Sequence, residues 1–133
     1  MYYEDHIRKL LIDSCHSSVE AQQFFRSRLD DSKMLLLLLR IAKDDEDYGG
    51  DAPMQAAYYL SQFSASMLVP HAHELLAKLP VTDGFASHIA VALGKTQLPE
   101  VRQALLEGLG DASGPDAIYY QMALEEYDKQ HLA

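Results

Sequence analysis

Apolar residues recur every three or four positions along most of the chain, and no segment shows a convincing strand pattern. Prolines, glycines and capping residues divide the pattern into segments of helix length. The sequence therefore predicts an all-α protein of about eight antiparallel helices, because short connections turn each helix back along its neighbour. The predicted helices cover residues 3–13, 17–29, 33–43, 53–63, 66–79, 83–94, 99–110 and 113–127.

The segment 33–43 is apolar around nearly its whole circumference, with Arg40 as its only internal charge. A helix without a polar face is normally buried on several sides. We therefore expect it to be the central core helix. We also expect a single domain over residues 1–133, in which residues 1–43 form irregular N-terminal helices that end with this core helix.

A spacing of about thirty residues repeats in the second half of the chain. Ala56, Ala86 and Ala117 stand 30 and 31 residues apart. A leucine cluster recurs with the same shift, first as Leu75, Leu76 and Leu79 and then as Leu105, Leu106 and Leu109. Periods of this length are typical of stacked helical pairs, in which no single pair can bury its apolar face alone. The spacing therefore predicts a short α-solenoid.

This period, the doubled leucines and the prolines near helix starts at Pro70 and Pro99 make residues 52–130 resemble HEAT repeats and, more loosely, armadillo repeats. The resemblance implies a right-handed solenoid of antiparallel hairpins with a concave face that holds a partner. Some HEAT-like proteins are enzymes, such as bilin lyases, but no residue set in this chain supports that activity. The resemblance therefore favours a protein-binding role.

The net charge of −9 lies entirely in the second part of the chain. Residues 1–40 hold six acids and six bases, whereas residues 41–133 hold fourteen acids and five bases. Such acidity disfavours nucleic acid and anionic membrane surfaces, which require Lys and Arg on one face. It favours a basic protein partner, with solubility alone as the alternative explanation.

The chain shows no signal for export or membrane insertion. Its longest apolar run, residues 34–39, is far shorter than the roughly 20 residues that span a bilayer. The N-terminus is polar and acidic, and the single cysteine, Cys15, cannot form an internal disulfide. We expect a cytoplasmic protein.

The longest break between predicted helices is an acidic, glycine-containing segment at residues 44–51. We predict that the side chains of Asp44, Asp45, Glu46 and Asp47 pair with Lys and Arg of a partner. We predict that Tyr48 and Asp51 also contact it. Calcium binding is an alternative for the carboxylates. However, the segment lacks the alternating ligand spacing and terminal glutamate of an EF-hand loop.

Two tyrosine pairs, Tyr58-Tyr59 and Tyr119-Tyr120, lie 61 residues apart, which is two periods. Tyr59 and Tyr120 align with the inward apolar stripe. Tyr58 and Tyr119 would then form a row with His88 on successive helices. We predict that this row is a protein-binding ridge, because tyrosine supplies a large contact area and a hydrogen bond at low entropic cost. The alternative is that the rings only fill gaps between helices.

Other candidate chemistry is weaker. His71, His73 and Glu74 resemble a metal-ligand set, but residues two apart on a helix point in different directions. Cys15 beside His16 could suggest a nucleophile and its base, yet adjacent residues seldom align for that chemistry. We predict no catalytic residue, metal site or cofactor.

The leading functional hypothesis is an immunity protein that binds and neutralises a basic, nuclease-type toxin through its acidic surface. Small acidic bacterial immunity proteins are similar to this chain in size and charge, without a shared motif. The first alternative is a general HEAT-like adaptor or assembly subunit. The second is a metal- or ligand-binding enzyme that uses the His71 and His73 region. The sequence leaves the oligomeric state open.

Overall fold

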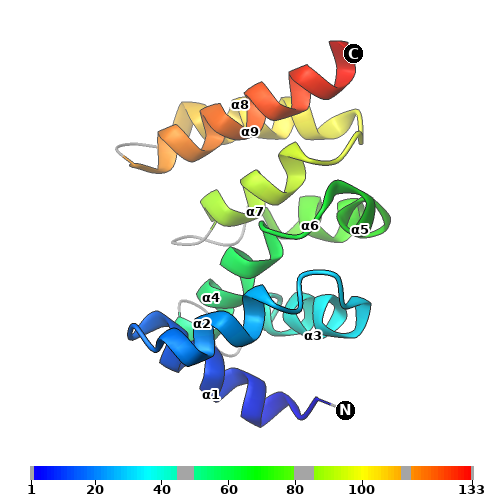
Figure 1. Ribbon diagram of the computed structural model, residues 1–133. Coiled ribbons are helices and arrows are strands. Elements are labelled where there is room, and N and C mark those ends of the chain that lie inside the picture. Colours follow the sequence, from blue (N-terminus) through cyan, green and yellow to red (C-terminus); the bar gives the residue numbers. More distant parts are fainter. Residues whose placement is uncertain (1, 45–49, 80–85, 112–114, 133) are drawn as a thin grey trace.

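The computed structural model describes residues 2–44, 50–79, 86–111 and 115–132, and all regular structure within these ranges is helical. The predicted all-α class is confirmed. The chain climbs from α1 at one end of the molecule to α9 at the other (Figure 1). The α-helices are α1 (Glu4–Cys15), α2 (Val19–Arg26), α3 (Ser32–Ala42), α4 (Asp51–Leu60), α5 (Ala65–Leu68), α6 (Ala72–Lys78), α7 (Ala86–Gly94), α8 (Glu100–Asp111) and α9 (Pro115–Leu132).

Side-chain caps explain where two of the N-terminal helices begin. The Asp31 carboxylate accepts hydrogen bonds from the amides of Lys33 and Met34 and so caps α3. Helix α2 begins later than the predicted start at residue 17. Its cap is Ser18, whose hydroxyl accepts a hydrogen bond from the Ala21 amide at 3.3 Å, while Ser17 has a φ of 74° that turns the chain before the helix.

The segment predicted as one helix over residues 66–79 is divided into α5, a 3-10 turn at Val69–His71, and α6. The break lies at Pro70, which lacks a backbone N–H and whose ring clashes with the preceding helical turn. Other predicted ends also shift: α2 stops at Arg26, α4 spans Asp51–Leu60 in place of 53–63, and α9 continues to Leu132. The predicted helix starts at residues 83 and 113 lie outside the described residues.

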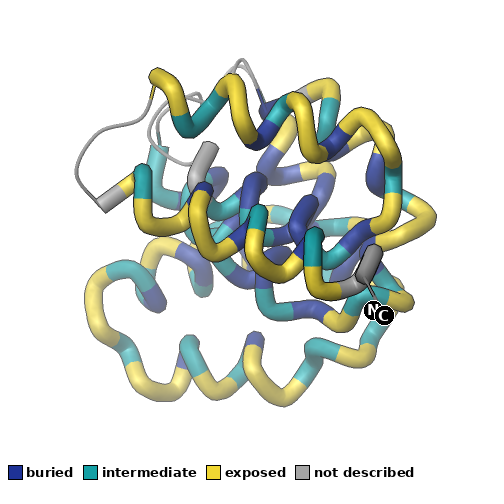
Figure 2. Tube along the Cα trace, turned by 90° about the horizontal axis from the view of Figure 1, so that it is seen from above, coloured by how far each residue is buried: buried dark blue, intermediate teal, exposed yellow. Residues whose placement is uncertain are grey.

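Buried positions gather between the helices, and exposed positions face outward (Figure 2). Helix α3 buries most of its apolar residues, but it is not surrounded, because Leu36 is 53% exposed. The more central helix is α4, which contacts α1, α3 and α7. The prediction of a central α3 therefore needs correction, since its outer side faces solvent.

The helices α4, α7 and α9 contact one another in series, α4 against α7 and α7 against α9. At the α7–α9 contact, a Cβ on Gly94 would lie 2.6 Å from the carbonyl oxygen of Ala123. The glycine at the end of α7 is thus required by close helix packing. At the other contact, the Lys95 ammonium that follows α7 donates to the carbonyls of Ser61 and Phe63 just after α4, at 2.6 and 2.9 Å.

Among the described helices, none is both long enough and apolar enough to cross a membrane.

Candidate protein-binding face

The helices α4, α7 and α9 each contribute one ring to a continuous row. Tyr58 meets His88 with ring centroids 5.5 Å apart, and His88 meets Tyr119 at 5.7 Å. Both contacts are edge-on, the geometry that aromatic quadrupoles prefer. The predicted row of Tyr58, His88 and Tyr119, which we call the aromatic row, is therefore confirmed as a geometry. Its role in binding stays a prediction.

The second tyrosine of each pair points inward, as the sequence predicted. Tyr59 and Tyr120 are both buried. Tyr59 also stacks on Phe25 of α2 at 4.7 Å and contacts Tyr58 at 5.1 Å. The aromatic row is thus braced from behind by a ring that belongs to the core. This ring-to-ring link across α2 and α4 is a feature that sequence reasoning missed, because no spacing in the chain relates residues 25 and 59.

The row becomes more exposed toward α9. Tyr58 and His88 are half-buried, whereas Tyr119 is 36% exposed. Burial lowers the pKa of His88, and the nearby Asp116 carboxylate opposes part of that shift. The imidazole is therefore neutral near pH 7, with one nitrogen to donate and one to accept a hydrogen bond. The row offers rings and hydrogen-bonding groups without a charge of its own.

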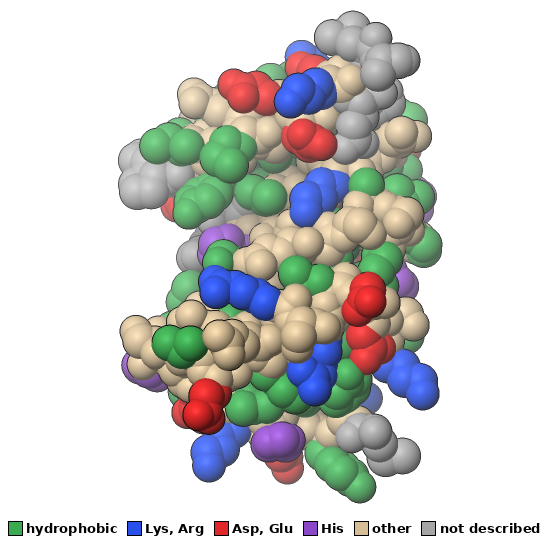
Figure 3. Space-filling view, in the orientation of Figure 1, with side chains coloured by type: hydrophobic (Ala, Val, Ile, Leu, Met, Phe, Trp, Pro, Cys, Tyr) green, Lys and Arg blue, Asp and Glu red, His purple; other side chains and the backbone are tan. Residues whose placement is uncertain are grey.

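Helix α9 has a second apolar side that the sequence analysis did not identify. Ile118 and Met122 are 58% and 51% exposed, one turn apart beside Tyr119. Hydrophobic side chains accordingly gather over the start of α9 (Figure 3). A helical-wheel reading would have found them, since they lie roughly opposite the inward residues Tyr120 and Ala123.

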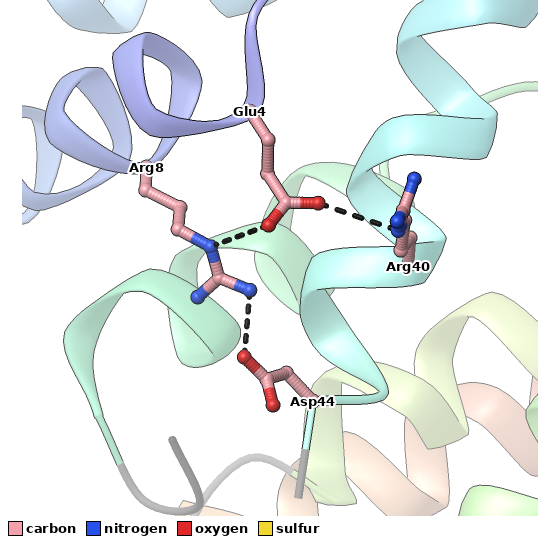
Figure 4. A network of polar contacts seen from close by, with 4 residues as sticks. All are labelled: Glu4, Arg8, Arg40 and Asp44. Carbon is pink, nitrogen blue, oxygen red and sulfur yellow. Dashed lines mark hydrogen bonds and ion pairs between the residues drawn. The ribbon is translucent and has the colours of Figure 1, made fainter. Parts of the chain in front are cut away.

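The described ends of the acidic segment are already paired inside the molecule. Arg8 of α1 bonds Asp44 at 2.7 Å and Glu4 at 3.2 Å, and Glu4 also pairs with Arg40 at 3.3 Å (Figure 4). This network ties α1 to α3 and to Asp44, the second residue after that helix. A partner cation would therefore have to compete with Arg8 for Asp44.

The other acidic residue that can be placed is Asp51, the first residue of α4. Its carboxylate lies 3.3 Å from Nε2 of His16. Seven residues separate it from Tyr58, so both lie on one side of α4, about 10 Å apart along the axis. Asp51 thus lies on the same side of α4 as the first ring of the aromatic row. The remaining candidates, Asp45, Glu46, Asp47 and Tyr48, lie outside the described residues.

The histidines proposed as an alternative do not converge on a common point. Nδ1 of His71 lies 3.9 Å from Glu74, which also pairs with Lys43, and His73 is exposed. Within the described ranges, no three His, Cys, Asp or Glu side chains are grouped closely enough to hold a metal ion. Cys15 is a free thiol.

No protein-family model matches the chain, and comparisons with curated proteins and with solved structures find no match. The similarity to HEAT repeats therefore rests on the residue pattern alone.

Proposed function

We propose that this protein is a binding module for a basic protein, and that its specific role is to neutralise a nuclease-type toxin as an immunity protein. The observation that carries the proposal is the aromatic row. Tyr58, His88 and Tyr119 lie in contact on three successive packed helices, in a chain of net charge −9. Partly exposed tyrosines braced by a core are typical anchors of protein interfaces.

We propose further that the helices form a short right-handed solenoid of HEAT-like hairpins. The serial contact of α4, α7 and α9 supports this, because their equivalent residues stand about thirty positions apart. In such a stack, equivalent side chains repeat along one surface, and the aromatic row follows that rule. The free thiol of Cys15 accords with a cytoplasmic location.

The negative charge of the C-terminal helices favours a basic partner for this surface. Residues 100–132, which include α8 and α9, hold seven acids and two bases, a net charge of −5. A toxin nuclease carries a basic cleft for its substrate, so opposite charges would speed encounter and raise specificity. Asp51 lies on the same side of α4 as Tyr58, where it can meet a further Lys or Arg of the partner.

The proposal is tested by recovering a partner from the native host and measuring its affinity for variants. Tyr58→Ala combined with Tyr119→Ala should weaken binding by about tenfold or more, since buried tyrosine anchors carry much of the energy of an interface. The matched control is Tyr3→Ala, because Tyr3 is highly exposed and lies outside the row. Equal affinity of the row variant and the control would refute the proposed contact.

Charge reversal gives a second arm of the same experiment. Replacing Asp45, Glu46 and Asp47 with lysine should lower the association rate at low salt, and the loss should shrink as salt screens the charges. A partner that associates at the same rate after this reversal would contradict the electrostatic part of the proposal.

A general adaptor or assembly subunit is the second candidate. The exposed apolar side of α9 favours it, because assembly subunits bury such surfaces against neighbours. Sedimentation over a concentration series distinguishes the two: an assembly subunit should self-associate, whereas a stoichiometric inhibitor should remain monomeric until its partner is added.

A further inference from the structure

The ring behind the aromatic row is fixed from two sides. Tyr59 of α4 is completely buried, and its ring stacks on Phe25 of α2 with centroids 4.7 Å apart. Its hydroxyl shares a hydrogen bond with the hydroxyl of Ser14 on α1, and Ser14 is itself buried. We call Ser14 and Phe25 the Tyr59 anchor. Both residues come from helices that contribute no ring to the aromatic row.

Ser14 joins three helices at this point. Besides its contact with Tyr59, its hydroxyl donates to Oε1 of Gln55, one turn earlier on α4, at 3.4 Å. Its backbone carbonyl accepts a hydrogen bond from the Gln22 side chain of α2 at 3.2 Å. A buried hydroxyl without a partner costs more free energy than its hydrogen bond contributes. The pairing with Ser14 therefore restricts where the Tyr59 ring can lie.

The Tyr59 ring in turn supports Tyr58. The two rings meet edge-on with centroids 5.1 Å apart. Tyr58 is half-buried, and its other described ring contact is with His88 at 5.5 Å. A half-buried ring that is supported on one side only has more than one rotamer available to it. Tyr59 therefore supplies the second support, which keeps Tyr58 against His88.

We propose that Ser14 and Phe25 are positioning residues of the aromatic row: they hold Tyr59 in place, and Tyr59 holds Tyr58 against His88. The inference rests on the proposed function and deepens it, because it makes helices α1 and α2 determine the geometry of a binding surface on α4, α7 and α9. Preorganised side chains bind more tightly, since they lose less freedom when the partner arrives. The alternative is that the Tyr59 anchor stabilises the fold and leaves the row unaffected.

His88 reports the position of Tyr58 without any partner. Burial lowers the pKa of His88, and the groups around its ring are Tyr58, Tyr119 and the Asp116 carboxylate. If Tyr58 moves away, water reaches the imidazole and the pKa of His88 should rise toward the ordinary value of 6.5. Burial raises the pKa of Tyr59, so this hydroxyl does not titrate in the same range. The titration is followed by NMR, and the His88 signal is identified by its absence in His88→Phe.

Two variants remove the two contacts of the Tyr59 anchor. Phe25→Leu removes the stacked ring. Ser14→Ala combined with Tyr59→Phe, the hydroxyl-pair variant, removes both partners of the hydrogen bond and leaves neither hydroxyl buried without the other. The matched control is Ile7→Val, which removes a fully buried methylene group from α1 about two turns before Ser14. Circular dichroism establishes that each variant is folded before the titration.

We expect the pKa of His88 to rise in both anchor variants and to stay unchanged in Ile7→Val. Phe25→Leu should produce the larger rise, because the stack covers a face of the Tyr59 ring whereas the hydrogen bond holds one atom. The anchor variants should also weaken the affinity for the host partner about three- to tenfold, the cost of ordering one side chain on binding. The affinity of Ile7→Val should stay within about twofold of that of the unchanged protein.

Three results would count against the inference. An unchanged pKa of His88 in both anchor variants would show that the row keeps its geometry without the anchor. A rise in Ile7→Val as large as that in Phe25→Leu would show that any loss of core packing has this effect. A rise in Phe25→Leu alone would refute the role of Ser14. If Phe25→Leu does not fold, the hydroxyl-pair variant decides.

The outcome for the proposed function is read separately, because the titration needs no partner. If the pKa of His88 rises as expected but Tyr58→Ala with Tyr119→Ala leaves the affinity of the host partner unchanged, the positioning role stands and the proposed function falls. If those alanine substitutions weaken binding while the anchor variants leave both the pKa and the affinity unchanged, the proposed function stands and the inference falls.

Discussion

The first four helices and the last two differ in how some of their acidic residues are engaged. In the N-terminal region Asp44 and Glu4 hold Arg8, and Asp31 caps α3 and accepts a hydrogen bond from Tyr2. In the last two helices Arg102 bonds Asp128, but Asp116 and Glu125 face solvent without an ion pair to a described residue. Several carboxylates therefore hold N-terminal segments in place, whereas two on α9 are open to solvent.

Apolar residues also differ in exposure between the two regions. Helices α3 and α4 bury most of theirs, whereas α9 leaves Ile118 and Met122 in solvent. Exposed apolar and acidic groups add little to the stability of the monomer, because their environment hardly changes on folding. The comparison indicates that the N-terminal helices hold much of the folding energy, whereas α9 leaves apolar and acidic groups in solvent.

The largest expected effect concerns α3. Leu38 is 0% exposed and Leu36, two residues earlier on the same helix, is 53% exposed. Leu38→Ala should lower the free energy of unfolding by about 2–5 kcal/mol, because it leaves a cavity. Leu36→Ala should change it by less than about 0.5 kcal/mol. Urea unfolding followed by circular dichroism measures both, and equal losses would contradict the assigned burial.

Two glycines at the other end test the packing of the C-terminal helices. A Cβ on Gly94 would meet the backbone of Ala123, whereas a Cβ on Gly110 would meet no atom within 4 Å. Gly94→Ala should cost about 1–3 kcal/mol, since α7 and α9 must separate. Gly110→Ala should stabilise α8 by up to about 1 kcal/mol through helix propensity. Thermal unfolding of the two variants should therefore shift in opposite directions.

These glycines also show what could be predicted from the sequence. The helical class and the aromatic row follow from local periodicity and a thirty-residue spacing, which one chain displays directly. The need for glycine at position 94 could not be predicted, because it depends on close packing against Ala123, which lies 29 residues away. The Arg8 network is hidden for the same reason: its members become neighbours only after α1 packs near the end of α3. The exposed stripe of Ile118 and Met122 on α9 could have been predicted from a helical wheel, because these apolar residues do not fall on the side that holds Tyr120 and Ala123.

The aromatic row links the two regions, and its histidine predicts a pH effect. The folded-state pKa of His88 is lowered by burial, with Tyr58, Tyr119 and Asp116 around the ring. Above the ordinary value of 6.5 the imidazole is neutral in both states. Between the lowered pKa and 6.5 the unfolded chain binds more protons, so the free energy of unfolding should fall as the pH falls.

The pH effect of His88 is measured by comparing the unchanged protein with a variant that lacks the imidazole. His88→Phe keeps a ring between the tyrosines but cannot bind a proton. Its unfolding free energy, followed from pH 7.5 downward, should fall less steeply than that of the unchanged protein in the window just below 6.5. Parallel curves would show that the folded state binds this proton as readily as the unfolded chain.

The smallest expected effect tests the contrast between the acids themselves. Asp44→Asn removes the charge from a carboxylate that bonds Arg8 at 2.7 Å, and it should cost up to about 1 kcal/mol, the range of partly exposed ion pairs. Glu125→Gln removes an exposed charge from an acidic hairpin and should leave stability unchanged or slightly higher, because like-charge repulsion falls. Both variants should be measured at low and high salt, since salt should erase the difference between them. If Glu125→Gln proves as destabilising as Asp44→Asn, the exposed C-terminal carboxylates contribute to the fold. The distinction between a stabilised end and a solvent-exposed end would then be wrong.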